Sequence, residues 1–217
     1  MKLQSKTYTS YNFYFIAPFL LWVLLGAFWQ WTYDKQLLFS YVNNRYNDLL
    51  DTVMIILTNM GEGILILPVL LLLLLKKEYR NLRFIGAALF ANIGAFLFSQ
   101  ALKSYYDFPR PLNYFHEAKW IHIAHDWERY FHRSFPSGHA TGAFAFFSFL
   151  SFLLKPHHKG WGVFFFALAL LVAYSRLYLA AHFFADVYVG SIIGVFFSTL
   201  AITLFYQKPY LRNQHES

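Results

Sequence analysis

The chain alternates between long apolar stretches and short polar segments. Six of the apolar stretches have the roughly 20 residues that a helix needs to cross a bilayer. They lie near 12–32, 52–75, 82–102, 136–154, 161–178 and 183–206. The last two adjoin, but polar residues interrupt the run where one span would end and the next begin, namely Ser175, Arg176, His182 and Asp186. The pattern predicts an all-α fold, a bundle of six transmembrane helices.

Composition agrees with a chain that is surrounded largely by lipid. Apolar residues make up 58% of the 217 residues and charged residues only 13%, whereas soluble domains carry about a quarter charged residues. The length suits a single domain, residues 1–217. The chain has no cysteine, so disulfides, thiolate catalysis and cysteine-bound metals are excluded. The first apolar stretch is longer than a signal sequence and has no small-residue cleavage site, which predicts a retained first span.

The distribution of basic residues predicts how the helices are oriented. With the N-terminus inside, more than half of the 18 basic residues fall on the inner side: Lys2, Lys6, Lys76, Lys77, Arg80, Arg83, Lys155, Lys159, Lys208 and Arg212. The positive-inside rule then places both termini in the cytoplasm and the polar loop 104–135 outside. We expect a multi-pass protein of a bacterial inner membrane. The net charge of +7 lies in short loops that meet lipid headgroups, and it does not indicate nucleic-acid binding.

Three polar clusters lie at the ends of predicted spans. Lys103 closes the third span and Arg110-Pro111 follows it. The fourth span opens with Pro136-Ser137-Gly138-His139, and Ser175-Arg176, His182 and Asp186 lie between the fifth and sixth. Odd spans end outside and even spans begin outside, so all three clusters should meet at the outer, periplasmic face.

The cationic side chains of the clusters predict an anion site. Lys103, Arg110 and Arg176 concentrate positive charge, and the two guanidiniums present paired donors suited to phosphate oxygens. Pro136 suits the first turn of a helix. The amides of Ser137, Gly138 and His139 should then be unpaired donors at the positive end of the fourth span.

The histidines of the clusters predict phosphoryl transfer. His182 and Asp186 are four residues apart, so on a helix they would share a face and the carboxylate could orient the imidazole. His182 could attack phosphorus to give a phosphohistidine, and His139 could protonate the departing alkoxide. The cations would stabilise charge on the transferring group. This chemistry requires neither a metal nor a cofactor.

The three motifs resemble the signature of the type 2 phosphatidic acid phosphatase (PAP2) family. They are Lys103-x6-Arg110-Pro111, Pro136-Ser137-Gly138-His139 and Ser175-Arg176-x5-His182-x3-Asp186, in that order and without a departure at any motif position. The resemblance implies a metal-independent phosphatase with His182 as nucleophile, Asp186 as its partner and His139 as acid. It implies a phosphate site built from Lys103, Arg110, Ser137, Gly138 and Arg176.

The resemblance also implies a lipid substrate without identifying it. Family members act on phosphatidic acid, phosphatidylglycerol phosphate, undecaprenyl diphosphate, lipid A phosphates and sphingoid phosphates, and some transfer the phosphoryl group to a second lipid. We favour an envelope lipid such as undecaprenyl diphosphate, with phosphatidylglycerol phosphate and lipid A phosphate as alternatives. A lipid-to-lipid phosphotransferase and a non-catalytic lipid-phosphate-binding membrane protein remain open. Vanadate-dependent haloperoxidases share the motif chemistry, but the predicted spans argue against a soluble oxidase.

Several other polar residues have structural explanations. The loop histidines His116, His122, His125 and His132 are spaced too irregularly for a zinc site, so we expect them to be solvated or to contact headgroups. Glu62 falls about ten residues into the second span, where a carboxylate is costly. We expect a neutral or hydrogen-bonded structural role for it, with a functional role as the alternative. Ala87, Ala91 and Ala95 should be helix-packing positions.

Overall fold

A computed structural model describes residues 11–125 and 127–206. Within these ranges the chain is helical and forms no β-strand, as the sequence predicts. The elements are α1 (Phe13–Thr32), α2 (Lys35–Asn43), α3 (Asp48–Thr58), η1 (Asn59–Gly61), α4 (Gly63–Leu73), η2 (Lys77–Tyr79), α5 (Leu82–Leu89), η3 (Phe90–Gly94), α6 (Ala95–Tyr106), α7 (Pro111–Tyr114), α8 (Gly138–Leu153), η4 (Pro156–Trp161), α9 (Gly162–Tyr178) and α10 (Phe184–Tyr206).

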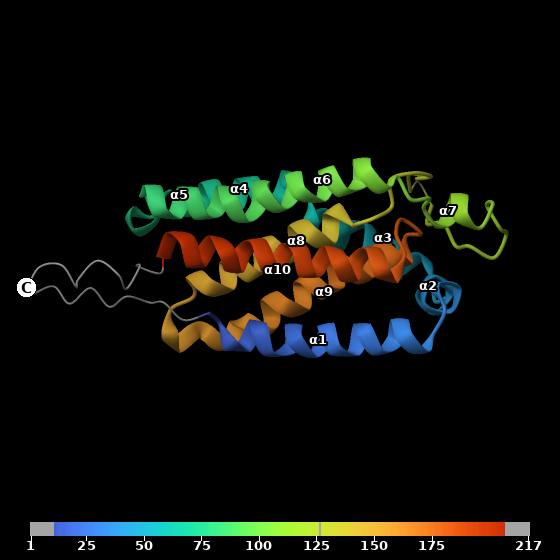
Figure 1. Cartoon of the computed structure of the whole chain (residues 1–217), viewed down its shortest axis with the longest axis horizontal. Helices are drawn as coiled ribbons and strands as arrows, with labels where there is room; N and C mark the ends of the chain where they lie inside the picture. Colours follow the sequence, from blue (N-terminus) through green and yellow to red (C-terminus); the bar gives the residue numbers. More distant parts are fainter. Residues whose placement is uncertain (1–10, 126, 207–217) are drawn as a thin grey trace, which may run out of the picture.

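The helices run side by side along the long axis of the molecule (Figure 1). Four segments are long and apolar enough to cross a membrane, and the bent pair formed by α3–η1 and α4 makes a fifth. Helix α8 is apolar but has only 16 residues. Length and composition thus support four or five spans, and the count of six remains a prediction.

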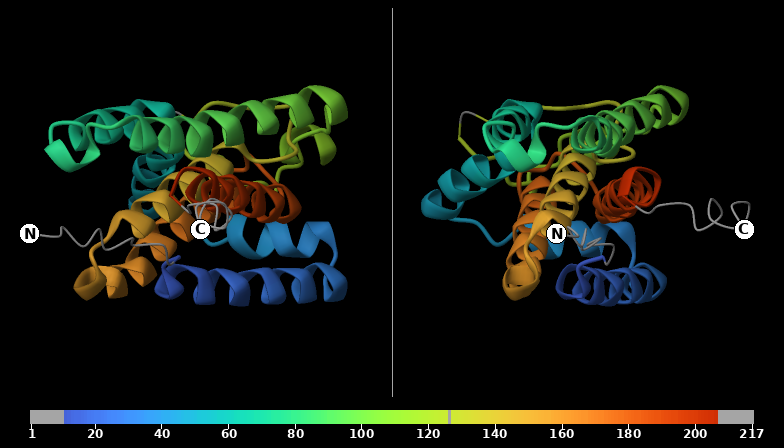
Figure 2. Two further views of the ribbon diagram at one scale, coloured as in Figure 1. Left: turned by 60° about the vertical axis from the view of Figure 1, so that its left-hand side comes forward. Right: turned by 90° about the vertical axis from the view of Figure 1, so that its left-hand side faces the viewer.

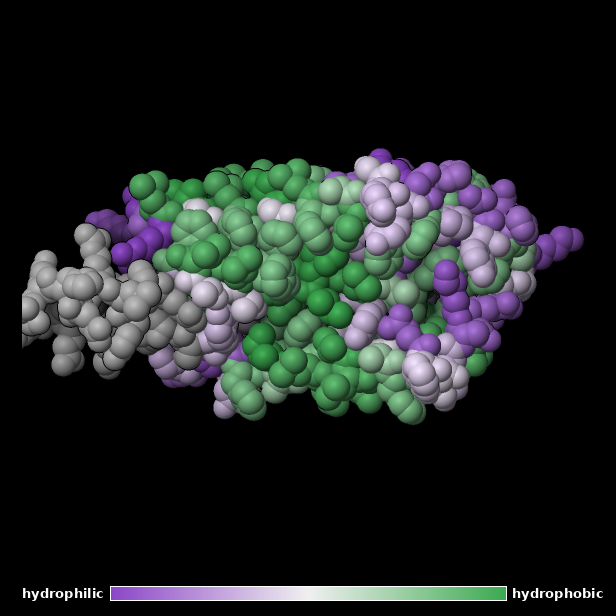
Figure 3. Space-filling model, in the orientation of Figure 1, coloured by the Kyte–Doolittle hydropathy of each residue, from purple (hydrophilic) through white to green (hydrophobic). Residues whose placement is uncertain are grey.

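The hydropathy of the surface matches this reading. On the face shown in Figure 3, hydrophobic residues gather over the middle of the molecule, while hydrophilic residues gather at its two ends. One polar end carries α2, α7 and the loop after α6, and the opposite end carries η2 and η4 (Figure 1). An apolar belt between two polar ends is typical of proteins that span a bilayer.

Helix α8 lies at the centre of the bundle. It packs most extensively against α10 and α9, with α5 and α6 on one side of this core and α1 on the other (Figure 2). The α8–α10 contact depends on a close backbone approach, because a methyl group at Gly190 would lie 2.7 Å from the carbonyl oxygen of Ser137. This contact holds the start of α8 against the start of α10, where two of the three motifs lie.

Short polar side chains determine where several helices begin. Asn12 accepts a hydrogen bond from the amide of Tyr14 at 3.0 Å, and Asn81 accepts one from the amide of Phe84 at 2.9 Å. These bonds satisfy amides that have no partner within the helix. Most predicted span boundaries therefore agree with the observed helices to within one or two residues.

The second span departs from its prediction. The stretch 52–75 was expected to form one helix, but the chain bends by 53° between Asp48–Gly61 and Gly63–Leu73. Glu62 lies at the bend with an extended backbone, φ −100° and ψ 151°. The prediction that Glu62 lies within a continuous helix is therefore wrong. The sequence Asn59-Met60-Gly61-Glu62-Gly63 contains two glycines, and glycine is a poor helix former.

The third span is longer than predicted and contains a π-helical turn. It continues through α6 to Tyr106, so the loop predicted at 104–135 begins at Asp107. Ala87, Ala91 and Ala95 are fully buried, which confirms the prediction that they are packing positions. Ala87 and Ala91 share a core cluster with Phe149 of α8 and Ala201 of α10.

Two helices were not predicted. Helix α2 begins after Asp34, whose side chain accepts a hydrogen bond from the amide of Leu37 at 2.7 Å. Helix α7 is a single turn within the loop that follows α6. Both lie at the end of the molecule where the motif residues gather (Figure 1).

Candidate active site

All eight candidate residues lie at one end of the helix bundle. Lys103 is on the last turns of α6, Arg110 precedes α7, and Ser137, Gly138 and His139 begin α8. Arg176 is near the end of α9, His182 lies in the turn that follows, and Asp186 is in the first turn of α10. The structure thus brings together side chains that are up to 83 positions apart (103 to 186).

His182 faces Asp186, but not for the predicted reason. The two were expected to share a helix face, yet His182 precedes α10 and only Asp186 is helical. The turn is fixed because the amides of Ala181 and His182 both donate to the carbonyl oxygen of Arg176, at 3.0 and 3.1 Å. Nδ1 of His182 lies 3.4 Å from Oδ2 of Asp186. Nδ1 is therefore the ring nitrogen nearest the carboxylate, but at this distance the two atoms do not form a hydrogen bond, and Nδ1 has no other partner among the described residues.

Asp186 is itself held by two donors. Its Oδ2 accepts hydrogen bonds from Oγ of Ser134 at 2.5 Å and from the amide of Phe183 at 2.9 Å. Lys103 is buried nearby, and its Nζ donates to the carbonyl oxygens of Arg133 and Ser134 at 2.7 and 3.4 Å. Ser134 thus contacts both charged groups. Sequence reasoning missed it because it lies two residues before the second motif.

Arg110 is oriented by the loop and by the turn that carries His182. Its Nε donates to the carbonyl oxygen of His132 at 2.8 Å, and its Nη1 donates to that of Ala181 at 3.1 Å. The guanidinium lies over the ring of Tyr130, 4.6 Å from the centroid. Contacts on the face and two edges of the guanidinium leave few orientations open to it.

Arg176 is fully enclosed, with 1% of its surface exposed. Nη1 donates to Oγ1 of Thr58 at 2.6 Å, and the guanidinium lies 5.4 Å from the ring of Trp127. Nε is buried and has no hydrogen-bond partner in the described part of the protein. A buried, unpaired guanidinium donor is costly unless an anion can satisfy it.

The start of α8 differs from its prediction at one amide. Ser137 is the N-cap, with Oγ accepting from the amide of Ala140 at 3.3 Å. The amide of Ser137 was expected to be free, but it donates to the carbonyl oxygen of Asp186 at 2.9 Å. The amides of Gly138 and His139 remain the first two of the helix, where no intrahelical acceptor exists. Gly138 faces Lys103, since a methyl group at Gly138 would lie 3.8 Å from Cε of Lys103.

His139 is bonded to a residue outside the three motifs. Its Nε2 lies 2.7 Å from Oε1 of Glu62, the residue at the bend of the second span. His139 and Glu62 are the exposed part of the cluster, with side chains 23% and 42% exposed, whereas His182 is 1% exposed. The site is therefore closed around His182 and open beside His139.

Burial and the charges of the cluster favour the neutral form of His182. Burial lowers the pKa of His182 well below its ordinary value of 6.5, and the positive charges of Arg110, Lys103 and Arg176 lower it further. The free lone pair of an imidazole is a nucleophile only in the neutral form. The residues that concentrate positive charge at the site thus also favour the neutral form of His182.

Comparisons with known proteins show to which family the three motifs belong. The sequence model of the PAP2 superfamily matches residues 84–210, which contain all three motifs. The chain belongs to the PAP2 superfamily. It is similar to lipid phosphate phosphatase 1 of Arabidopsis thaliana, with 33% identity over 90 residues, a match that covers 36% of this chain and 28% of the plant protein. The chain thus matches less than a third of the length of that relative.

A solved structure extends the likeness to most of the fold. The crystal structure of LpxE from Aquifex aeolicus superposes with a TM-score of 0.64 at 25% identity, and the match covers 78% of this chain and 94% of LpxE. Together with the apolar helices, the family identifies the chain as an integral membrane protein.

One loop histidine of this PAP2 protein has a structural role. Nε2 of His122 lies 2.8 Å from Oδ1 of Asp51, and the same oxygen accepts a hydrogen bond from Tyr178 at 2.5 Å. The ring of His122 stacks on Tyr46, with centroids 3.7 Å apart. The prediction that the loop histidines are solvated or contact headgroups is therefore wrong for His122, which ties the loop to α3 and α9.

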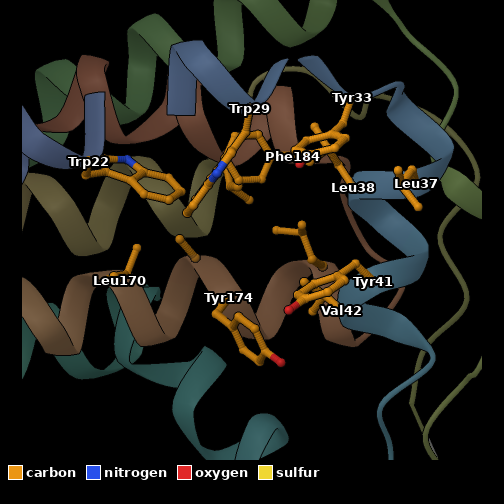
Figure 4. A pocket seen from close by; sticks show the side chains of 13 residues that line it. Trp22, Trp29, Tyr33, Leu37, Leu38, Tyr41, Val42, Leu170, Tyr174 and Phe184 are labelled. Carbon is orange, nitrogen blue, oxygen red and sulfur yellow. The ribbon is translucent and has the colours of Figure 1, made fainter. Parts of the chain in front are cut away.

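An apolar cavity of about 530 Å³ lies beside the end of this PAP2 protein that carries the candidate residues. Figure 4 shows Trp22 and Trp29 of α1, Leu38 and Tyr41 of α2 and Phe184 of α10 around it. None of the eight candidate residues lines it. Arg176 and Asp186 are on helices that border the cavity, but on other faces of those helices.

Proposed function

We propose that this chain is a lipid phosphatase that acts through a phosphohistidine at His182, at the outer face of a six-helix bundle. One observation carries the proposal. The buried imidazole of His182 is directed at Asp186 through Nδ1 at 3.4 Å, and three cationic side chains lie close enough to influence its pKa. A neutral imidazole beside three cations suits attack on a phosphorus atom whose oxygens carry negative charge.

The first step transfers the phosphoryl group to the enzyme. Asp186 holds the proton of His182 on Nδ1, so the lone pair of Nε2 attacks phosphorus. The bond between phosphorus and the lipid oxygen breaks, and His139 donates a proton to that departing oxygen. Lys103, Arg110, Arg176 and the amides at the start of α8 stabilise the charge on the equatorial oxygens.

The second step returns the enzyme to its starting state. A water molecule attacks the phosphorus of the phosphohistidine, and His139 accepts its proton. The bond between phosphorus and Nε2 of His182 then breaks and releases inorganic phosphate. No step needs a metal or a cofactor, because side-chain cations supply the positive charge.

The lipid nature of the substrate is supported by the surroundings of the site and by the relatives. The candidate residues lie where apolar spans end, so a phosphate on a membrane lipid can reach them while its chains stay in the bilayer. The plant relative is named a lipid phosphate phosphatase. We propose the same substrate class here, at the periplasmic face of a bacterial inner membrane with both termini cytoplasmic.

Within this class we favour an envelope lipid such as undecaprenyl diphosphate over phosphatidylglycerol phosphate and lipid A phosphate. The position of Arg133 supports a second phosphate contact. Its guanidinium donates to Oγ of Ser104 at 2.9 Å, and its carbonyl oxygen accepts a hydrogen bond from Lys103. Arg133 therefore lies beside the proposed phosphate site. Arg129 is instead paired with Glu117 at 3.4 Å in the exposed loop. Arg133→Gln should raise KM for a diphosphate lipid far more than for a monophosphate lipid, and Arg129→Gln is the matched comparison.

Phosphate release from purified lipid phosphates and diphosphates tests the proposal. Wild type should release phosphate, His182→Ala should release none above background, and His158→Ala, at the opposite end of the bundle, should behave as wild type. Acid-labile radiolabel on the protein after brief exposure to a labelled lipid phosphate would identify the phosphohistidine. Near wild-type release by His182→Ala would remove the mechanism. Phosphate transferred to a second lipid instead of water would assign a phosphotransferase.

A further inference from the structure

We infer that Glu62 is a positioning residue for His139 and holds the charge that lets this histidine act as the acid of the reaction. The inference rests on the proposed phosphatase function and adds a residue that lies outside the three motifs. Oε1 of Glu62 lies 2.7 Å from Nε2 of His139. Glu62 belongs to the second span, which contributes no residue to the motifs.

The bend of the second span is built against the first turns of α8. A methyl group at Gly61 would lie 2.6 Å from the carbonyl oxygen of His139, and one at Gly142 would lie 2.6 Å from the carbonyl oxygen of Gly61. Neither position has room for a side chain, so the two backbones are in direct contact. The bend therefore keeps Glu62 at a fixed distance from His139.

The backbone at the bend also aims the Glu62 side chain. Glu62 is extended and caps α4, with its carbonyl oxygen accepting from the amides of Leu65 and Ile66 at 3.1 Å each. A residue in a continuous transmembrane helix would instead point to whichever face its position dictates. The break thus frees Glu62 from the helix face and directs it toward the active site.

His139 needs a negative partner because its other charged neighbours are positive. Arg176 of α9, Arg110 before α7 and Lys103 of α6 all act on it, and His182 lies within range on a fourth segment. Burial and these three cations oppose the imidazolium form that must give up a proton to the departing oxygen. The carboxylate of Glu62, whose side chain is 42% exposed, opposes that effect.

The two histidines share the same three cations but differ in burial and in the distance to a carboxylate. His182 is 1% exposed, and its Nδ1 lies 3.4 Å from Asp186. His139 is 23% exposed, and its Nε2 lies 2.7 Å from Glu62. The closer carboxylate and the greater exposure favour the protonated form at His139, as a proton donor requires.

Leaving-group dependence distinguishes this role from a structural one. An alkyl lipid phosphate needs a protonated leaving oxygen, whereas p-nitrophenyl phosphate releases a stable phenolate that does not. Glu62→Gln keeps the shape and removes the charge. Its kcat/KM, which reports the step in which the leaving group departs, should fall by about 10- to 100-fold for the lipid and by less than about threefold for the aryl ester. Both rates come from one sample, so their ratio does not depend on how much enzyme is folded.

Companion variants complete the test. Glu62→Ala should lower the lipid-to-aryl ratio like Glu62→Gln, and Glu62→Asp, which keeps a carboxylate, should restore part of it. Glu78→Gln, at the opposite end of the bundle, should leave the ratio unchanged. In Glu62→Gln the basic limb of the kcat/KM profile for the lipid should move to lower pH. Without the carboxylate, His139 loses its proton at a lower pH.

The outcomes separate the inference from the function on which it rests. Equal losses on both substrates, or no loss on either, in Glu62→Gln would overturn the role of Glu62 and leave the phosphatase in place. An active His182→Ala variant would overturn the phosphohistidine mechanism whatever Glu62 does. An unchanged ratio in all three Glu62 variants would show that His139 acts without its carboxylate partner.

Discussion

Nδ1 of His182 lies 3.4 Å from Oδ2 of Asp186 although the two residues do not share a helix. The carboxylate is already fixed by Ser134 and by the amide of Phe183, so it can hold the imidazole in one orientation. Asp186→Asn should keep the fold and lower kcat by on the order of 10²- to 10⁴-fold. Phosphate release from detergent-solubilised protein measures this, with vanadate binding as the check on folding. A loss below tenfold would show that Asp186 does not orient the nucleophile.

The acid limb of the pH profile should lie below the ordinary range of histidine. The pKa of His182 is lowered by burial and by nearby cations, so falling pH protonates the nucleophile only well below about 6.5. Arg110→Gln removes one of these cations, which raises the pKa of His182 and should move the acid limb of kcat/KM to higher pH. The same substrate is used for both proteins, so its own ionisation cancels. A shift to lower pH would contradict the assignment.

The hydrogen bond from Arg176 to Thr58 should contribute to phosphate binding. Thr58→Val leaves a second buried donor of Arg176 without an acceptor, and a hydrogen bond to a charged group is worth about 1.5–3 kcal/mol. The inhibition constant of vanadate should therefore rise by roughly 10- to 100-fold. Thr58→Ser should restore binding, and Thr52→Val, on the exposed face of the same helix, is the matched control. Equal effects of Thr58→Val and Thr52→Val would count against the idea.

Activity should survive chelation, and vanadate should inhibit it. The proposed site uses side-chain cations and amides to stabilise the transferring group, and vanadate mimics its trigonal-bipyramidal geometry. Phosphate release measured with and without EDTA, and across a vanadate series, tests both statements. A loss in EDTA that a divalent ion restores would point to metal-dependent chemistry instead.

Single cysteines should report the orientation of the chain, which contains no cysteine of its own. Lys119→Cys in the loop after α6 should react with an impermeant thiol reagent added to intact cells, and Lys77→Cys in η2 should react only after lysis. Both residues are exposed. The reverse pattern would place the active site in the cytoplasm.

The sequence predicted the helical fold and the gathering of the motif residues because both depend on local signals. Long apolar stretches determine the helices, and alternating helix directions bring their ends to common faces. The sequence did not predict the partners of the motif residues, such as Thr58 with Arg176 and Ser134 with Asp186. These pairs join segments whose contact depends on the packing of several helices, and no local pattern records it.

Glu62 shows where a local signal was available. A carboxylate between two glycines in the middle of an apolar stretch is unfavourable for a continuous transmembrane helix, both in helix propensity and in solvation. Those features together indicate a break, and a break lets a polar side chain leave the lipid and face a polar site. For His182 the local signal was misleading. Its i,i+4 spacing from Asp186 suggested a pair on one helix, but the turn around Ala181 determines how the two side chains meet.

The bend in the second span also limits how far this enzyme can be shortened. The superfamily match begins at residue 84, whereas Thr58 and Glu62 precede it by more than twenty positions. A fragment trimmed to the matched segment would keep every motif residue, yet Arg176 would lose its acceptor and His139 its carboxylate. The smallest fragment able to turn over a lipid therefore has to begin before α3, and chimeras that exchange only the motif-bearing half would inherit an unsupported site.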